Sequence, residues 1–120
     1  MGFFGRLFRT KKAFWHGVTA VVNYTVQSGD PVFDLEEKLL AAINAAGVGE
    51  YQQFWAPLDW SEIIYEMHGP DADRLFAVVK PVMEAASFMD GAEVTLRYGP
   101  DVKGTHTAVV ILRSTFRLAV

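Results

Sequence analysis

The chain has 120 residues, of which 51% are hydrophobic and 21% are charged, a balance typical of one ordinary globular domain. It contains no cysteine, which excludes both a disulfide framework and a thiolate metal site. Four of its 11 basic residues but none of its 14 acidic ones lie before Ala13, so the rest of the chain is strongly acidic. Nucleic acid is therefore not an expected partner, because its phosphates require a basic face.

A basic leader, residues 1–14, precedes a single α+β domain that we expect over residues 15–120. Its apolar side chains fall on one side of a helix and its basic ones largely off that side, as in helices that lie on a membrane surface. This predicts a short amphipathic helix with weak membrane-surface contact, unless the helix packs on its own domain or frays in solution instead. No segment has the length of a membrane span or the composition of a secretory signal, so we expect a cytoplasmic protein. The apolar residues are Phe3, Phe4, Leu7 and Phe8, and the basic ones are Arg6, Arg9 and Lys12.

The first strand and the first helix follow the leader. Apolar and polar residues alternate over residues 18–26, and this period of two predicts a strand with one buried face. Asp34 and Glu37 then have the spacing of a capping box, which predicts that a helix begins at Asp34. An apolar stripe continues to Gly47, a residue type at which helices commonly end.

Two further strands come next in the chain. Residues 48–55 are strand-like but polar at Gln52 and Gln53, as is typical of a strand at the edge of a sheet. Residues 62–68 alternate more regularly, which predicts a half-buried strand. The residues expected on the inner face of this strand are Ile63, Tyr65 and Met67.

A second helix is followed by the last two strands. Asp71, which follows a glycine and a proline, has the short carboxylate that caps the first N–H groups of a helix. An apolar stripe over residues 75–86 predicts the helix, and Pro81 within it predicts a kink but not a break. Alternation over residues 92–98 and 107–113 predicts two strands joined as a hairpin.

The order of these elements is β-α-β-β-α-β with one more strand at the end, which predicts a ferredoxin-like plait. In that fold an antiparallel sheet of about five strands has both helices on one face, and its first strand lies between the third and fourth. The segments AAINAAGVGEY, HGPDADRLFAVVKPVMEA and GAEVTLRYGP resemble a group of small bacterial proteins that are uncharacterised single-domain members of this fold. The resemblance implies the fold and no activity.

Three histidines are the candidates for chemistry in a chain that has no glycine-rich phosphate loop, no HExxH motif and no recognisable nucleophile motif. Because strand directions alternate, we expect His16, His68 and His106 at one end of the sheet. Asp71 and Asp101 should lie near them, and imidazoles with carboxylates can bind a metal or relay protons. The alternative is that all are solvated residues at strand ends, and we expect neither a metal nor a cofactor.

Trp55 and Trp60 bracket a short loop and form a second candidate site. Indoles are common interface anchors, and Asp59 and Glu62 beside them are placed to meet a basic partner at the rim. Immunity proteins that neutralise basic toxins bind in this way. The alternative is that these aromatic residues cap the core of their own domain.

The sheet face turned away from the helices is the third candidate. The alternation places four apolar residues there in a polar frame, a kind of patch that another surface commonly covers. Either a second chain binds this face, or the leader or residues 115–120 fold back across it. We therefore expect a non-catalytic protein-interaction or oligomerisation module, which binds a protein partner or itself. The alternatives are an immunity-type protein and a small enzyme or metal-binding protein that uses the histidines. The four apolar residues are Val21, Ile64, Val109 and Ile111.

Overall fold

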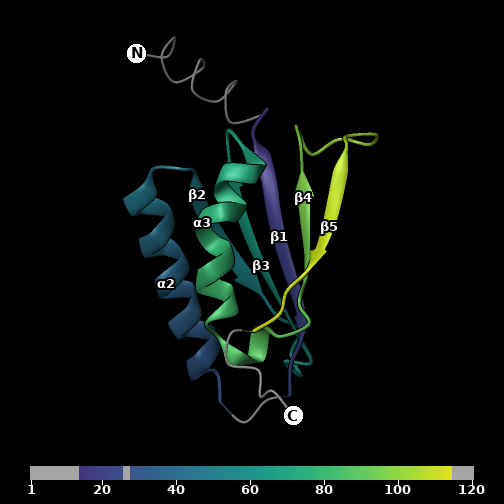
Figure 1. Ribbon diagram of the computed structural model, residues 1–120. Coiled ribbons are helices and arrows are strands. Elements are labelled where there is room, and N and C mark those ends of the chain that lie inside the picture. The colour runs from purple at the N-terminus through teal and green to yellow at the C-terminus, as the bar shows by residue number, and fades with distance from the viewer. Residues whose placement is uncertain (1–13, 26–27, 115–120) are drawn as a thin grey trace, which may run out of the picture.

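Two helices cover one face of a five-stranded antiparallel sheet in the computed structural model, which describes residues 14–25 and 28–114 (Figure 1). The predicted α+β class, with an antiparallel sheet and two helices, is confirmed. The predicted amphipathic helix of the leader lies outside the described residues, as does the segment 115–120. The elements are β1 (His16–Asn23), α2 (Asp30–Ala46), β2 (Glu50–Trp55), β3 (Glu62–Gly69), α3 (Ala72–Glu84), the short 3₁₀ helix η1 (Ser87–Met89), β4 (Glu93–Arg97) and β5 (Thr107–Ile111).

The strand order is β2-β3-β1-β4-β5, so β1 is the central strand and β2 and β5 are the edges. This arrangement is compatible with a ferredoxin-like plait. Alternate residues of β1, β3 and β4 are buried beneath α2 and α3, as the period of two predicted. The strand β1 ends at Asn23, short of residue 26 where the alternation ends. The core residues from these three strands are Val18, Ala20, Val22, Ile63, Tyr65, Met67, Val94 and Leu96.

Helix α2 begins one turn before Asp34, so the predicted capping box is wrong. Pro31 lies in the first turn, where the missing N–H group costs nothing because it would have no partner inside the helix. Val32 is fully buried, and this tertiary contact extends the helix towards its N-terminus. Asp34 instead forms an exposed ion pair with Lys38 at 2.9 Å. The predicted end at Gly47 is confirmed, and this glycine has a left-handed φ of 63°.

The N-terminus of α3 is capped as predicted. The carboxylate of Asp71 accepts hydrogen bonds from the backbone N–H groups of Asp73 at 3.0 Å and of Arg74 at 3.2 Å. The helix continues through Pro81 as one element. Pro81 is exposed on the solvent side of α3, where water can satisfy the carbonyl group that loses its helical partner.

Removing the cap of α3 should weaken the fold by a small, measurable amount. We expect Asp71→Ala to lower the free energy of unfolding by about 1 kcal/mol, because two backbone N–H groups lose their acceptor. Urea denaturation followed by circular dichroism measures the change. As a control, Asp34→Ala removes only an exposed ion pair and should change stability by less than about 0.5 kcal/mol. Equal effects of the two substitutions would show that Asp71 is not a stabilising cap.

The main chain of the loop before β2 lies directly against the end of β3. A Cβ atom on Gly49 would overlap the backbone carbonyl oxygen of His68, and a Cβ atom on Gly69 would overlap that of Val48. Gly49 also has a φ of 151°, which residues with side chains rarely adopt. Both positions therefore require glycine, and their contact fixes the edge strand β2 against β3.

Candidate functional site

The sheet face turned away from α2 and α3, here called the outer face, carries the apolar residues that the alternation placed there. Both helices lie on the other side of the sheet, so neither covers this face (Figure 1). Trp55 is 53% exposed, Val109 is 56% exposed and Ile111 is 47% exposed. One row of paired residues crosses all five strands in the order Trp55, Ile64, Val21, Glu93 and Ile111.

Acidic side chains surround this apolar row. Glu93 stands within it, Glu62 lies on one side of it, and Glu66 and Glu50 lie on the other side. Among the described residues of the five strands, Arg97 is the one basic side chain placed on the outer face. The face therefore combines an apolar centre with a surplus of negative charge.

Arg97 lies over Gly17 at the end of the sheet where β1 begins. Its Nε donates a hydrogen bond to the carbonyl of Gly99 at 2.8 Å, and its Nη2 donates to the carbonyl of Trp15 at 3.2 Å. Asp101 is 3.9 Å from its Nη1. A Cβ atom on Gly17 would be only 2.8 Å from Nη1, so the glycine makes room for the guanidinium group. Arg97 helps to line a polar pocket of about 120 Å³ with Gly17, Thr19, Glu66, Met67, His68 and Asp101.

His68 shares this pocket and pairs with Gly17 across the strands. Burial, and next the positive charge of Arg97, lower the pKa of His68 below its ordinary value. The nearby carboxylates of Glu66, Glu50 and Asp101 act in the opposite direction without cancelling this effect. The imidazole is therefore neutral at pH 7.

This shift makes stability depend on pH. Because the pKa is lower in the folded than in the unfolded chain, the contribution is complete above about pH 6.5 and is lost as the pH falls. We expect thermal midpoints measured from pH 8 to pH 5 to decline less for His68→Gln than for the unchanged protein. If the thermal midpoint of His68→Gln declines with falling pH as much as that of the unchanged protein, the lowered pKa of His68 is contradicted.

The histidines lie at one end of the sheet, as predicted, but they do not converge. His16 faces α3, where its Nδ1 accepts a hydrogen bond from the backbone N–H of Ala72 at 2.9 Å. Its ring is 5.9 Å from that of Tyr98, which is 5.5 Å from that of His106. His68 instead points to the outer face. In the part of the chain that the structure describes, no group of three or more histidine, aspartate and glutamate side chains could hold a metal ion.

The structure separates the two tryptophans of the predicted aromatic loop. Trp60 packs beside α2, with its ring 6.2 Å from Phe33 and 6.2 Å from Phe54, and so it caps the core locally. Trp55 points to the outer face, where Glu62 also lies. One half of the predicted loop site therefore belongs to the outer face, and the other half is structural.

Asp59 has a structural role in the same loop. Its Oδ1 accepts hydrogen bonds from the N–H group of Ser61 at 3.1 Å and from the Ser61 hydroxyl at 2.8 Å. These bonds lower the pKa of Asp59 below its ordinary range. The carboxylate of Asp59 is exposed, but it already holds the turn. The glutamates on the strands are therefore the more direct partners for a basic surface.

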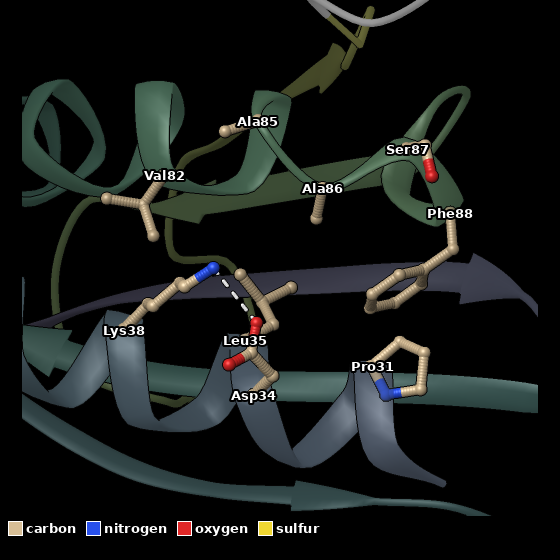
Figure 2. A pocket seen from close by; sticks show the side chains of 9 residues that line it. All are labelled: Pro31, Asp34, Leu35, Lys38, Val82, Ala85, Ala86, Ser87 and Phe88. Carbon is tan, nitrogen blue, oxygen red and sulfur yellow. Dashed lines mark ion pairs between the residues drawn. The ribbon is translucent and has the colours of Figure 1, made fainter. Parts of the chain in front are cut away.

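A pocket between α2 and α3 was not predicted from the sequence. It has a volume of about 190 Å³, and Figure 2 shows Phe88 and Pro31 facing each other at one end, with the Asp34 and Lys38 ion pair at the rim. The apolar stripe of α3 predicted one wall. The other wall was missed because it includes the first turn of α2, which the sequence placed outside the helix. The lining residues are Pro31, Asp34, Leu35, Lys38, Val82, Ala85, Ala86, Ser87 and Phe88.

Comparisons with known proteins give no match: no protein-family model, no curated protein and no solved structure matches this chain. The resemblance of its three sequence segments to uncharacterised bacterial proteins therefore stays a prediction. Among the described residues, no helix has the length and apolarity needed to cross a membrane. Because no related protein assigns a site, the outer face, built by residues from all five strands, is the candidate site on the basis of its geometry.

Proposed function

We propose that this chain is a non-catalytic protein-interaction module with a ferredoxin-like fold, and that the outer face is its binding surface. The observation that carries the proposal is the apolar row across the sheet, in which Trp55 and Ile111 are about half exposed. Single apolar residues on a surface are ordinary, but neighbouring apolar residues in a polar frame, as Trp55, Ile64 and Val21 are here, are typical of a binding site. Trp55 supplies the large aromatic anchor that interface hot spots favour.

The size of the outer face indicates the kind of interface. Five strands spaced by about 4.8 Å make it about 24 Å wide, and five residues per strand make it about 17 Å long. The flat area is thus about 400 Å², whereas a standard interface buries about 800 Å² of accessible surface on each partner. Side-chain relief raises the accessible area above the flat value, so the outer face suits a small or transient interface. A permanent obligate dimer would require more.

The proposal is tested by placing a charge at the exposed end of the apolar row, on the edge strand β5. Ile111→Arg should leave the fold intact, because the side chain is 47% exposed and its replacement stays within reach of water. It should abolish any self-association in sedimentation measurements. In a comparative pull-down from the source cells, it should also lose the proteins that the unchanged chain retains.

A matched control uses Val102, which is 62% exposed but lies in the loop between β4 and β5. Val102→Arg adds the same charge away from the patch and should behave as the unchanged chain does. If Ile111→Arg and Val102→Arg associate and retain partners equally, the outer face is not the binding surface.

The acidic frame favours a second candidate, an immunity-type protein that neutralises a basic toxin. Glu62, Glu66 and Glu93 surround the apolar row and would meet cationic side chains of such a toxin. The test is whether a basic protein retained by the unchanged chain loses its toxic activity in the complex, and regains it with Ile111→Arg. The third alternative, a small enzyme or metal-binding protein that uses the histidines, has less support, because the three histidine side chains do not converge in the described part of the chain.

A further inference from the structure

The position at which the chain joins the sheet determines which of its own segments can reach the outer face. The strand β1 is central and begins at His16, so the leader is attached at the middle of the sheet and at one end of it. Arg97, from the outer face, holds the carbonyl group of Trp15 by a hydrogen bond of 3.2 Å. The attachment point of the leader is therefore fixed at the border of the outer face.

The length of the leader matches the length of the face. A helix of residues 2–12 would be about 16 Å long. The four residue steps from the row of Gly17 to the row of Val21 measure about 13 Å, which a helix of this length spans. A helix that turned back along β1 would thus cover the outer face from its polar pocket to its apolar row. Phe3 and Phe4, at the far end of that helix, would reach the apolar row.

The chemistry of the two surfaces is complementary. The leader carries four basic residues and no acid, whereas the outer face carries Glu50, Glu62, Glu66 and Glu93. Arg97, the basic side chain of the face, is held by two backbone carbonyl groups. The apolar side of the leader matches the apolar row. Opposite charges around an apolar centre fix the orientation of a docked segment.

A helix of this length also needs a surface on which to form. Isolated helices shorter than about 12 residues are marginal in water. Gly2 and Gly5 weaken this one further, by up to about 1 kcal/mol each. A helix in the leader would therefore need an apolar surface to stabilise it.

We propose that residues 2–12 dock as an amphipathic helix on the outer face of their own chain, with Phe3 and Phe4 on the apolar row. The helix shields Val21 and Ile64, on β1 and its neighbour β3, from water, and a protein that binds this face must first displace it. Only this last consequence rests on the proposed function. The docking itself does not depend on it.

The absence of cysteine from the chain makes a clean crosslinking test possible. We expect the double variant Phe4→Cys with Ile64→Cys to form an intramolecular disulfide in oxidised glutathione. Two thiols are oxidised to one disulfide, and glutathione disulfide is reduced to two glutathione molecules. The control is Phe4→Cys with Val102→Cys, which lies in the loop at the same end of the sheet as the attachment point of the leader. A freely moving leader would reach Val102 at least as easily, so a docked leader should crosslink to position 64 at least tenfold faster.

Charge reversal separates docking from chance encounter. Adding Arg6→Glu and Arg9→Glu to the first pair should reduce its crosslinking rate to that of the control pair. Equal rates for the two pairs, or disulfides formed mainly between two chains at low concentration, would overturn docking in the same chain. If docking is observed but the charge reversals leave partner binding unchanged, the docking stands. In that case the outer face is not the partner site, and the proposed function fails separately.

Discussion

Gly49→Ala should destabilise the domain by at least about 3 kcal/mol, the largest effect that we expect from any single added methyl group in this chain. The new Cβ atom would overlap the backbone carbonyl oxygen of His68, which the ladder between β2 and β3 holds in place. A φ of 151° adds strain for any residue with a side chain. We expect a large drop in the urea midpoint and in soluble yield.

Gly47→Ala provides the matched control. Gly47 also has a positive φ, at 63°, but a Cβ atom there would meet nothing within 4 Å. The cost should be limited to that of a left-handed alanine, about 1–2 kcal/mol. Similar losses for Gly47→Ala and Gly49→Ala would mean that backbone conformation, and not the contact between the two chain segments, is what requires glycine at position 49.

Leu39→Ala should have the second largest effect, a loss of about 2–5 kcal/mol in the free energy of unfolding. Leu39 is fully buried on the side of α2 that packs against the sheet. The substitution removes apolar contacts and leaves a cavity that the rigid sheet cannot close. Denaturation by urea, followed by tryptophan fluorescence, measures the loss.

The neighbouring residue gives a control within the same helix turn. Leu40 is 43% exposed, so Leu40→Ala removes the same atoms from a position that water already reaches. It should change stability by no more than about 0.5 kcal/mol. Comparable losses at positions 39 and 40 would show that the burial of α2 is not what stabilises the fold.

Features with a local cause could be predicted from the sequence. The alternation in β3 follows from the geometry of a strand, and the burial of Ile63, Tyr65 and Met67 confirms it. The cap at Asp71 and the end of α2 at Gly47 depend on the conformation of one or two residues. In these cases the residue type carries enough information by itself.

Features that depend on distant contacts could not be predicted. The early start of α2 follows from the burial of Val32, which no local pattern indicates. The separation of Trp60 from Trp55 depends on Phe33, a residue that lies in the unpredicted turn of α2. The contact between Gly49 and the end of β3 requires knowledge of how closely the main chains of these two segments approach each other.

The candidate sites show the same division. The outer face could be predicted, because alternation alone assigns Val21, Ile64 and Ile111 to one side of the sheet. The histidines were correctly placed at one end. Applied to them, the same alternation would have put His16 and His68 on opposite sides, since His16 shares the side of Val18 and His68 does not. The place of a residue at the end of a strand determines its position along the sheet. Its odd or even place in the alternation determines the face of the sheet on which its side chain lies.

The edges of the sheet have a consequence for aggregation. The pairing of β2 with β3 is irregular between Tyr51 and Gln53, so an added strand could not continue a regular ladder along this edge. The other edge, β5, has only five residues. Neither edge is a long template for a foreign strand, and runaway growth into fibres is thereby discouraged. Association through the outer face, unlike strand addition at an edge, would end once that face is covered.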